Sequence, residues 1–175
     1  MRYVALLRGI NVGGNTMVKM EELRRTFEAL GFENVTSYIN SGNLAFDARK
    51  ASETNLVKKI EDGVERLIDK RVQVMVREQP DIERVIASNP FDGKYQSHKE
   101  MHVLFLGSAL SNEQISLLTE ATPSGEHFQV SGREIYCHLP MGVADSYLGR
   151  GQFEKKLGAA VTARNWRTVQ KLAEL

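Results

Sequence analysis

A glycine-rich segment close to the N-terminus carries residue types that bind phosphate and other anions. The segment, residues 7–15, reads Leu-Arg-Gly-Ile-Asn-Val-Gly-Gly-Asn and lies between a predicted strand and a predicted helix. Backbone N–H groups at a helix start point outward, and glycine lets a ligand approach the backbone closely. The candidate ligand-binding residues in this segment are Arg8, Gly9, Asn11, Gly13 and Gly14. The spacing matches neither the Walker pattern nor the dinucleotide fingerprint, so the alternative is a loop whose glycines only permit positive φ angles.

A second polar motif, residues 37–43, reads Ser-Tyr-Ile-Asn-Ser-Gly-Asn. Asn and Gly at a chain reversal are first of all turn residues, so the motif taken alone favours a plain turn between two strands. The functional interpretation makes Asn40, Ser41 and Asn43 hydrogen-bonding partners of a ligand. Both interpretations place these residues at the tip of a hairpin.

A third motif lies near the C-terminus, at residues 162–172, and reads Thr-Ala-Arg-Asn-Trp-Arg-Thr-Val-Gln-Lys-Leu. The spacing of Trp166 and Val169 predicts one apolar helix face, with Thr162 as the N-cap. The candidate ligand-binding residues of this motif are Arg164, Asn165 and Trp166. The alternative is a docking helix, in which Trp166 packs on a sheet and Arg164 pairs with an acidic neighbour.

Metal ligation and cysteine chemistry find no support in the sequence. The four histidines and the single cysteine show no zinc-ligand spacing, so we expect neither a metal nor a cofactor. Cys137 would need a base to act as a nucleophile, and His127 would reach it only across a predicted hairpin. We therefore interpret Cys137 as a buried and inert thiol.

Composition favours a globular protein of the cytoplasm. The chain has 175 residues, of which 42% are hydrophobic, and it has no run near the roughly 20 apolar residues that cross a bilayer. Arg8 interrupts the first apolar run too early for a signal peptide. A single cysteine excludes an internal disulfide, which fits a reducing compartment. We therefore expect a cytoplasmic protein that does not enter a membrane.

The net charge of +1 conceals an uneven distribution along the chain. Residues 1–25 carry five Lys or Arg against two Glu, and residues 150–175 carry six against two, which leaves the middle of the chain acidic. If the two ends meet in space, they form a basic surface that attracts an anionic small molecule or a nucleic acid. The alternative is that these charges only solvate separate helix faces.

The elements that must position these residues can be predicted from hydrophobic spacing. In the first half we expect strands at residues 2–8, 35–39, 44–46 and 72–76, with helices over 20–30 and 56–68. This β-α-β-β-α-β order is the ferredoxin-like pattern. Right-handed crossovers would then give an antiparallel sheet with both helices on one face.

The second half nearly repeats this order. A helix opens at Pro80, and strands are predicted over residues 101–106, 128–130 and 134–138. Helices are expected from Ser111, from about Val143 and from about Thr162, which gives β-α-β-β-α. The predicted fold class is α+β, with two related ferredoxin-like halves, residues 1–79 and 80–175, packed into one compact unit.

The three motifs together resemble the bacterial domain of unknown function 1697 family. The matching residues are Leu7–Gly14, Tyr38–Asn43, Thr162–Thr168 with Val169, Lys171 and Leu172, and Lys19 and Met20. The family's turn more often has Gln where this chain has Asn40, which shortens the donor there. The resemblance implies two related α+β halves, and it implies no activity. It also implies that the polar and glycine motifs distinguish the family, rather than its apolar positions.

Three hypotheses for the function follow. The favoured one is a binding module for a phosphate-bearing ligand, either a nucleotide or a short nucleic acid. The alternatives are a small-molecule enzyme, whose site lies at the junction of the three motifs, and a protein–protein adaptor. The first two depend on the three motifs surrounding one hollow, and the sequence leaves the oligomeric state open.

Overall fold

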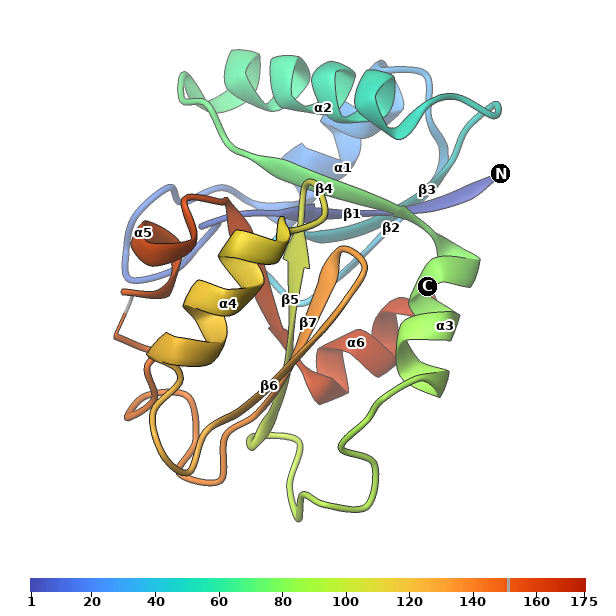
Figure 1. Ribbon diagram of the computed structural model, residues 1–175. Coiled ribbons are helices and arrows are strands. Elements are labelled where there is room, and N and C mark those ends of the chain that lie inside the picture. Colours follow the sequence, from blue (N-terminus) through green and yellow to red (C-terminus); the bar gives the residue numbers. More distant parts are fainter. Residues whose placement is uncertain (151) are drawn as a thin grey trace. The chain divides into compact units, whose positions relative to one another are not determined.

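The structure, a computed structural model, describes residues 1–150 and 152–175. Within these residues the chain forms eight strands and six helices, and the strands make two four-stranded antiparallel sheets (Figure 1). Two compact units contain them. The first comprises Met1–Arg84 and Lys171–Leu175, and the second comprises Val85–Gln170. No helix in the described part of the chain is long and apolar enough to cross a membrane.

The first sheet has the strand order β2-β3-β1-β4. Its strands are β1 (Arg2–Leu7), β2 (Glu33–Tyr38), β3 (Asn43–Asp47) and β4 (Val74–Glu78). The helices of this unit are α1 (Met20–Ala29) and α2 (Glu53–Ile68). Because β1 runs antiparallel to β4, Leu7 lies opposite Val74, so the end of β1 and the start of β4 lie side by side at one end of the sheet. The predicted element order and the antiparallel sheet are therefore present in this unit.

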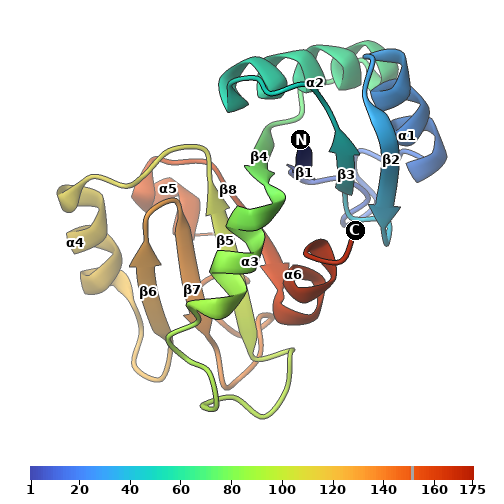
Figure 2. The ribbon, with the colours of Figure 1, turned by 90° about the vertical axis from the view of Figure 1, so that its right-hand side faces the viewer.

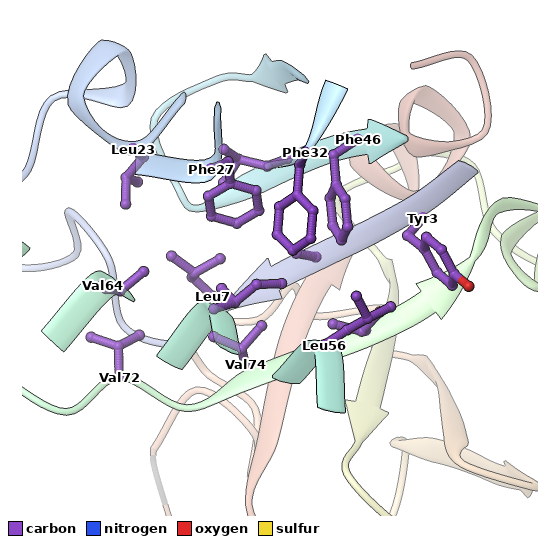
Figure 3. Close-up of a cluster of buried hydrophobic side chains, with 14 of the residues drawn as sticks. Tyr3, Leu7, Leu23, Phe27, Phe32, Phe46, Leu56, Val64, Val72 and Val74 are labelled. Atoms are coloured by element: carbon purple, nitrogen blue, oxygen red, sulfur yellow. The ribbon is translucent and has the colours of Figure 1, made fainter. Parts of the chain in front are cut away.

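The core of the first unit forms between one face of this sheet and the two helices. Leu23 and Phe27 on α1, and Ile60 on α2, are fully buried against the sheet. Figure 3 shows the rings of Phe27, Phe32 and Phe46 gathered beside β1, and the Phe32 and Phe46 centroids are 4.3 Å apart. Burial of these large rings supplies the hydrophobic stabilisation that holds both helices on the same face.

The last residues of the chain are tied to the first unit by side-chain hydrogen bonds to their carbonyl groups. Arg2 Nε donates to the Leu175 carbonyl over 3.1 Å. Gln79 Nε2 donates to the Ala173 carbonyl over 3.0 Å. These hydrogen bonds attach residues 171–175 to the first unit.

The second sheet has the strand order β6-β7-β5-β8. Its strands are β5 (Met101–Leu106), β6 (His127–Ser131), β7 (Glu134–His138) and β8 (Val161–Asn165), and its helices are α4 (Asn112–Ala121) and α5 (Phe153–Leu157). Two further helices, α3 (Gln79–Ala87) and α6 (Trp166–Leu172), span the boundaries between the units. Leu118 of α4 and Leu157 of α5 pack with Leu104 and Ile135 of the sheet, so both helices cover one sheet face (Figure 2).

The predicted helix start at Thr162 is wrong, because residues 161–165 form strand β8. Thr162 pairs with Phe105 of β5, and the β-branched Val161 and Thr162 suit a strand. The helix begins only at Trp166, where Asn165 Oδ1 accepts a hydrogen bond from the Thr168 amide over 2.9 Å. The second half therefore has the order β-α-β-β-α-β before α6, rather than the predicted β-α-β-β-α.

The helix predicted from about Val143 is also wrong, because residues 143–150 form turns and α5 starts at Phe153. Ser146 explains the difference. Its hydroxyl donates to the Val143 carbonyl over 2.6 Å and accepts from the Gly149 amide over 3.0 Å. A serine side chain that bonds the nearby backbone in this way competes with helix hydrogen bonding and stabilises turns.

Candidate functional site

The glycine-rich loop joins β1 to α1, and Asn11 organises it. The Asn11 side-chain amide donates to the Val18 carbonyl over 2.9 Å and to the Asn40 carbonyl over 2.7 Å. Its Oδ1 accepts a hydrogen bond from the Val18 amide over 2.8 Å. Asn11 has a φ of 54°, a left-handed conformation that asparagine tolerates better than most residues. These bonds close the loop and attach it to the Asn40 turn.

The turn at residues 40–43 packs directly against the end of β1. The Leu7 amide donates to the Gly42 carbonyl over 2.9 Å. A Cβ atom at position 42 would lie 2.9 Å from Leu7 Cβ and 3.0 Å from the Leu7 carbonyl oxygen. Gly42 also has a φ of 83°, so both the space and the backbone require glycine here. Two of the three predicted motifs therefore contact each other.

Asn43 closes the same turn from inside the protein. It is fully buried, and its amide donates to the Tyr38 carbonyl over 3.2 Å and to Ser41 Oγ over 3.0 Å. Asn40 is exposed, and its carbonyl group receives the bond from Asn11. Asn43 and Asn11 thus hold the two segments in place, while the Asn40 side chain faces solvent.

A basic pocket of about 510 Å³ lies beside this loop in the first unit. Its lining residues are Arg8, Gly9, Thr16, Lys70, Arg71, Val72 and Gln73. Arg8 Nη1 donates to Gln73 Oε1 over 3.0 Å, and the Arg8 amide donates to the Gln73 carbonyl over 2.9 Å. Lys70 Nζ donates to Thr16 Oγ1 over 2.8 Å. These bonds orient a guanidinium and an ammonium group at one wall of the pocket.

Two basic residues of the pocket, Arg71 and Lys70, have different neighbours. Arg71 forms ion pairs of 2.8 Å with Asp62, Glu65 and Glu61. Its hydrogen bond to Asp62 is the main cause that raises the Arg71 pKa and lowers the Asp62 pKa to about 2. Lys70, by contrast, contacts a neutral hydroxyl group. Arg8 and Lys70 are the other two basic residues that line the pocket.

Gly13 and Gly14 lie at the exposed tip of the loop. Both have positive φ angles, of 60° and 75°, and the Asn15 amide donates to the Val12 carbonyl over 3.1 Å across them. Two consecutive positive φ angles are typical of a tight hairpin turn. Gly9, with a φ of 70°, is the glycine of the motif that lines the pocket.

Thr16, Lys70 and Gln73 were not among the predicted site residues. A signal for Lys70 was present in the sequence, because Lys70 and Arg71 directly precede the predicted strand at residues 72–76. In a sheet where that strand is the antiparallel neighbour of the first, its start lies next to the end of the first strand. No local pattern singled out Thr16, which approaches Lys70 only through the folded path of the loop.

The third motif, with Arg164, Asn165 and Trp166, lies in the second unit. That all three motifs surround one hollow stays a prediction. Arg164 is buried on β8, and Nη1 donates to Thr162 Oγ1 over 2.7 Å and to the Ala163 carbonyl over 2.8 Å. Burial lowers the Arg164 pKa to about 10. Trp166 is buried and meets Tyr95 edge to face, with centroids 6.3 Å apart.

A larger hollow of about 700 Å³ lies at the opposite end of the first sheet, beside the end of β3 and the start of α2. Its lining carries charges of both signs, from Glu33 and Asp47 on one hand and Arg49 and Lys59 on the other. Hydrogen bonds from Asn34 and then Arg2 hold the pKa of Asp47 below its usual value. Lys59 Nζ lies 5.2 Å from the Phe32 ring centroid. Because acidic and basic side chains both line this hollow, it attracts an anion less strongly than the basic pocket does.

The histidines and Cys137 form no metal-binding group within the described residues. Cys137 is fully buried, and burial raises its thiol pKa well above the usual value. Its partner across the hairpin is Phe128, whereas His127 pairs with His138, and those two rings stack 5.6 Å apart. His138 Nε2 lies 3.6 Å from Glu100 Oε2.

Comparison with known proteins places the chain in a family without an assigned function. The sequence profile described as "Protein of unknown function (DUF1697)" matches residues 1–136. The structure is similar to that of the conserved bacterial protein SP0830 from Streptococcus pneumoniae, with a TM-score of 0.77 and 27% identity over 99% of this chain and 97% of that one. No curated protein matches the sequence. The chain belongs to the DUF1697 family of proteins of unknown function.

Proposed function

We propose that this protein binds a phosphate-bearing ligand, a nucleotide or a short nucleic acid, in the basic pocket between the glycine-rich loop and the start of β4. One observation carries the proposal: Arg8 and Lys70 line the same pocket as Gly9. A guanidinium group donates in a fixed fork that suits phosphate oxygens, and an ammonium group adds a point charge. Gly9 has no side chain to keep a phosphate away from the backbone.

The chemistry of the lining favours binding over catalysis. Among the described residues that line the pocket, none is Asp, Glu or His, which are the usual general bases. A hydroxyl and an amide, from Thr16 and Gln73, complete the polar wall. Such a wall can orient an anion and neutralise its charge, but it offers no group that takes up a proton near neutral pH.

We further propose that residues 1–79 and 80–175 are two related ferredoxin-like halves of a cytoplasmic protein. The strand orders β2-β3-β1-β4 and β6-β7-β5-β8 are the same when each half is numbered from its own first strand. Two buried arginines support the relationship, because Arg77 lies opposite Val4 in one sheet and Arg164 lies opposite Val103 in the other. The single buried Cys137 suits a reducing compartment.

Thermal unfolding with inorganic diphosphate tests the binding proposal. A ligand at tenfold its dissociation constant adds roughly 1.4 kcal/mol to the free energy of unfolding. We expect diphosphate to stabilise the protein at low salt, and added salt to weaken the effect by screening. Lys70→Ala should lower the affinity about tenfold, which corresponds to the loss of one charge-assisted contact of roughly 1.4 kcal/mol.

Lys50→Ala is the matched control, because Lys50 is exposed between β3 and α2, away from the pocket, and the net charge changes by the same amount. This variant should bind diphosphate as the unmodified protein does. If diphosphate fails to stabilise the protein at low salt, or if both variants lose affinity equally, the pocket is not a phosphate site.

A further inference from the structure

Apolar side chains that face solvent gather on the loop and the turn beside the basic pocket. Five large apolar side chains are exposed in the first unit, and three of them belong to these two segments. They are Val12, Met17 and Ile39, with exposed fractions of 59%, 66% and 52%. Exposed apolar groups that gather in one place indicate an interaction site more often than scattered ones do.

The hydrogen bonds of Asn11 join the two segments that carry these three residues. Val12 follows Asn11 directly, Met17 precedes Val18, and Ile39 precedes Asn40. Asn11 bonds both the Val18 and the Asn40 carbonyl groups. Adjacent Cα atoms are about 3.8 Å apart, so Val12 is one step from Asn11 itself, and Met17 and Ile39 are one step from the residues whose carbonyl groups it bonds. Met17 also follows Thr16, which lines the basic pocket.

The backbone of the same surface is in an unfavourable conformation at two β-branched residues. Ile39 has a φ of 48° and Thr16 has a φ of 50°. β-Branched residues rarely adopt the left-handed region, because Cβ crowds the backbone there. Strain of this kind is retained mainly where a binding surface requires it. Here it accompanies an exposed apolar side chain at Ile39 and the pocket hydroxyl of Thr16.

We infer that the ligand is a mononucleotide, with its phosphates at Arg8 and Lys70 and its base against Val12, Met17 and Ile39. This inference rests on the proposed function and selects one ligand class within it. A nucleobase has apolar faces that pack on aliphatic side chains, and the methionine thioether favours contact with aromatic rings. The pocket volume of about 510 Å³ falls within the usual range of small-molecule sites.

A longer nucleic-acid strand fits this surface less well than a mononucleotide does. Proteins that bind single strands combine a long basic groove with aromatic side chains on which successive bases stack. The described lining of the pocket has no aromatic residue, and the three exposed apolar side chains are aliphatic. One base and its phosphates therefore match the surface better than a series of stacked bases.

Titration calorimetry with three probes tests the inference: inorganic diphosphate, adenosine diphosphate and a single-stranded DNA oligonucleotide. We expect adenosine diphosphate to bind at least about tenfold tighter than inorganic diphosphate, because the base adds apolar contact. Met17→Gln should weaken adenosine diphosphate several-fold and leave inorganic diphosphate unchanged. Lys70→Ala should weaken both.

Met141→Gln is the matched control, since Met141 is an exposed methionine of the second unit. Met17 and Met141 are both solvent-exposed, so both variants should keep the unfolding midpoint of the unmodified protein. If adenosine diphosphate binds no tighter than inorganic diphosphate, the inference is overturned and the phosphate site stands. The same holds if Met17→Gln does not weaken adenosine diphosphate more than inorganic diphosphate. Tighter binding of the oligonucleotide overturns the choice of a mononucleotide. If no probe binds, the inference and the proposed function both fail.

Discussion

The Asn11 side-chain amide donates a 2.7 Å hydrogen bond to the Asn40 carbonyl and so joins the glycine-rich loop to the hairpin turn. The same amide group also bonds the Val18 carbonyl, at the end of the loop. One side chain therefore sets the position of a loop that supplies Arg8, Gly9 and Thr16 to the pocket. Under the proposed function, Asn11 would act on a ligand only through this loop, because Asn11 is not among the residues that line the pocket.

Replacing Asn11 should lower stability and loosen the loop. Asn11→Gly keeps the positive φ accessible and removes three hydrogen bonds. We expect the free energy of unfolding to fall by roughly 1–3 kcal/mol, because two of the three lost bonds, those to Val18, are partly buried. Urea unfolding measures the change, with Asn15→Gly, at an exposed position of the same loop, as the control. Equal losses in the two variants would show that the Asn11 bonds do not hold the loop.

Gly42 should tolerate no side chain. In Gly42→Ala the new Cβ would lie 2.9 Å from Leu7 Cβ and 3.0 Å from the Leu7 carbonyl oxygen, at a φ of 83°. Overpacking and left-handed strain together should cost roughly 2–4 kcal/mol of stability.

Gly31→Ala separates the two causes, because Gly31 has a φ of 86° and, apart from its two chain neighbours, no residue lies within 4 Å of an added Cβ. Strain alone should cost about 1–2 kcal/mol there. Denaturant unfolding measures the loss of stability in both variants. If Gly42→Ala loses no more stability than Gly31→Ala, the tight contact with Leu7 is contradicted.

Asp62 should remain ionised to unusually low pH. Its pKa is about 2 in the folded protein, below the ordinary 3.8, first because Arg71 donates a hydrogen bond to it. A depressed folded pKa means that the stabilising effect is present above pH 3.8 and is lost as the pH falls through about 2. NMR titration of the Asp62 carboxyl carbon measures this pKa.

Arg71→Gln should move the Asp62 pKa upward, toward the ordinary value of 3.8. Arg66→Gln is the control, because Arg66 is an exposed arginine in the last turn of α2. That variant should leave the Asp62 pKa where it is in the unmodified protein. If Arg71→Gln leaves the Asp62 pKa unchanged, the ion pair between Arg71 and Asp62 is contradicted.

Local sequence determined much of the first unit by itself. Apolar spacing in residues 20–30 and 56–68 predicts α1 and α2, because a helix that packs on a sheet must present one apolar face. The glycine at 42 indicates a tight turn, since few other residues adopt a positive φ. Such features depend on residues that are close in sequence, so the printed chain is enough to find them.

Tertiary structure decided which segments that are distant in the sequence pair or contact one another. Residues 161–165 form strand β8 and not the helix predicted from Thr162. Pairing with β5, in which Thr162 lies opposite Phe105, satisfies the backbone groups that a helix would have bonded internally. Lys70 meets Thr16, and Gln73 meets Arg8, only because β1 and β4 are antiparallel neighbours whose ends coincide. Contacts of this kind depend on strand order and loop path, which no short stretch of sequence specifies.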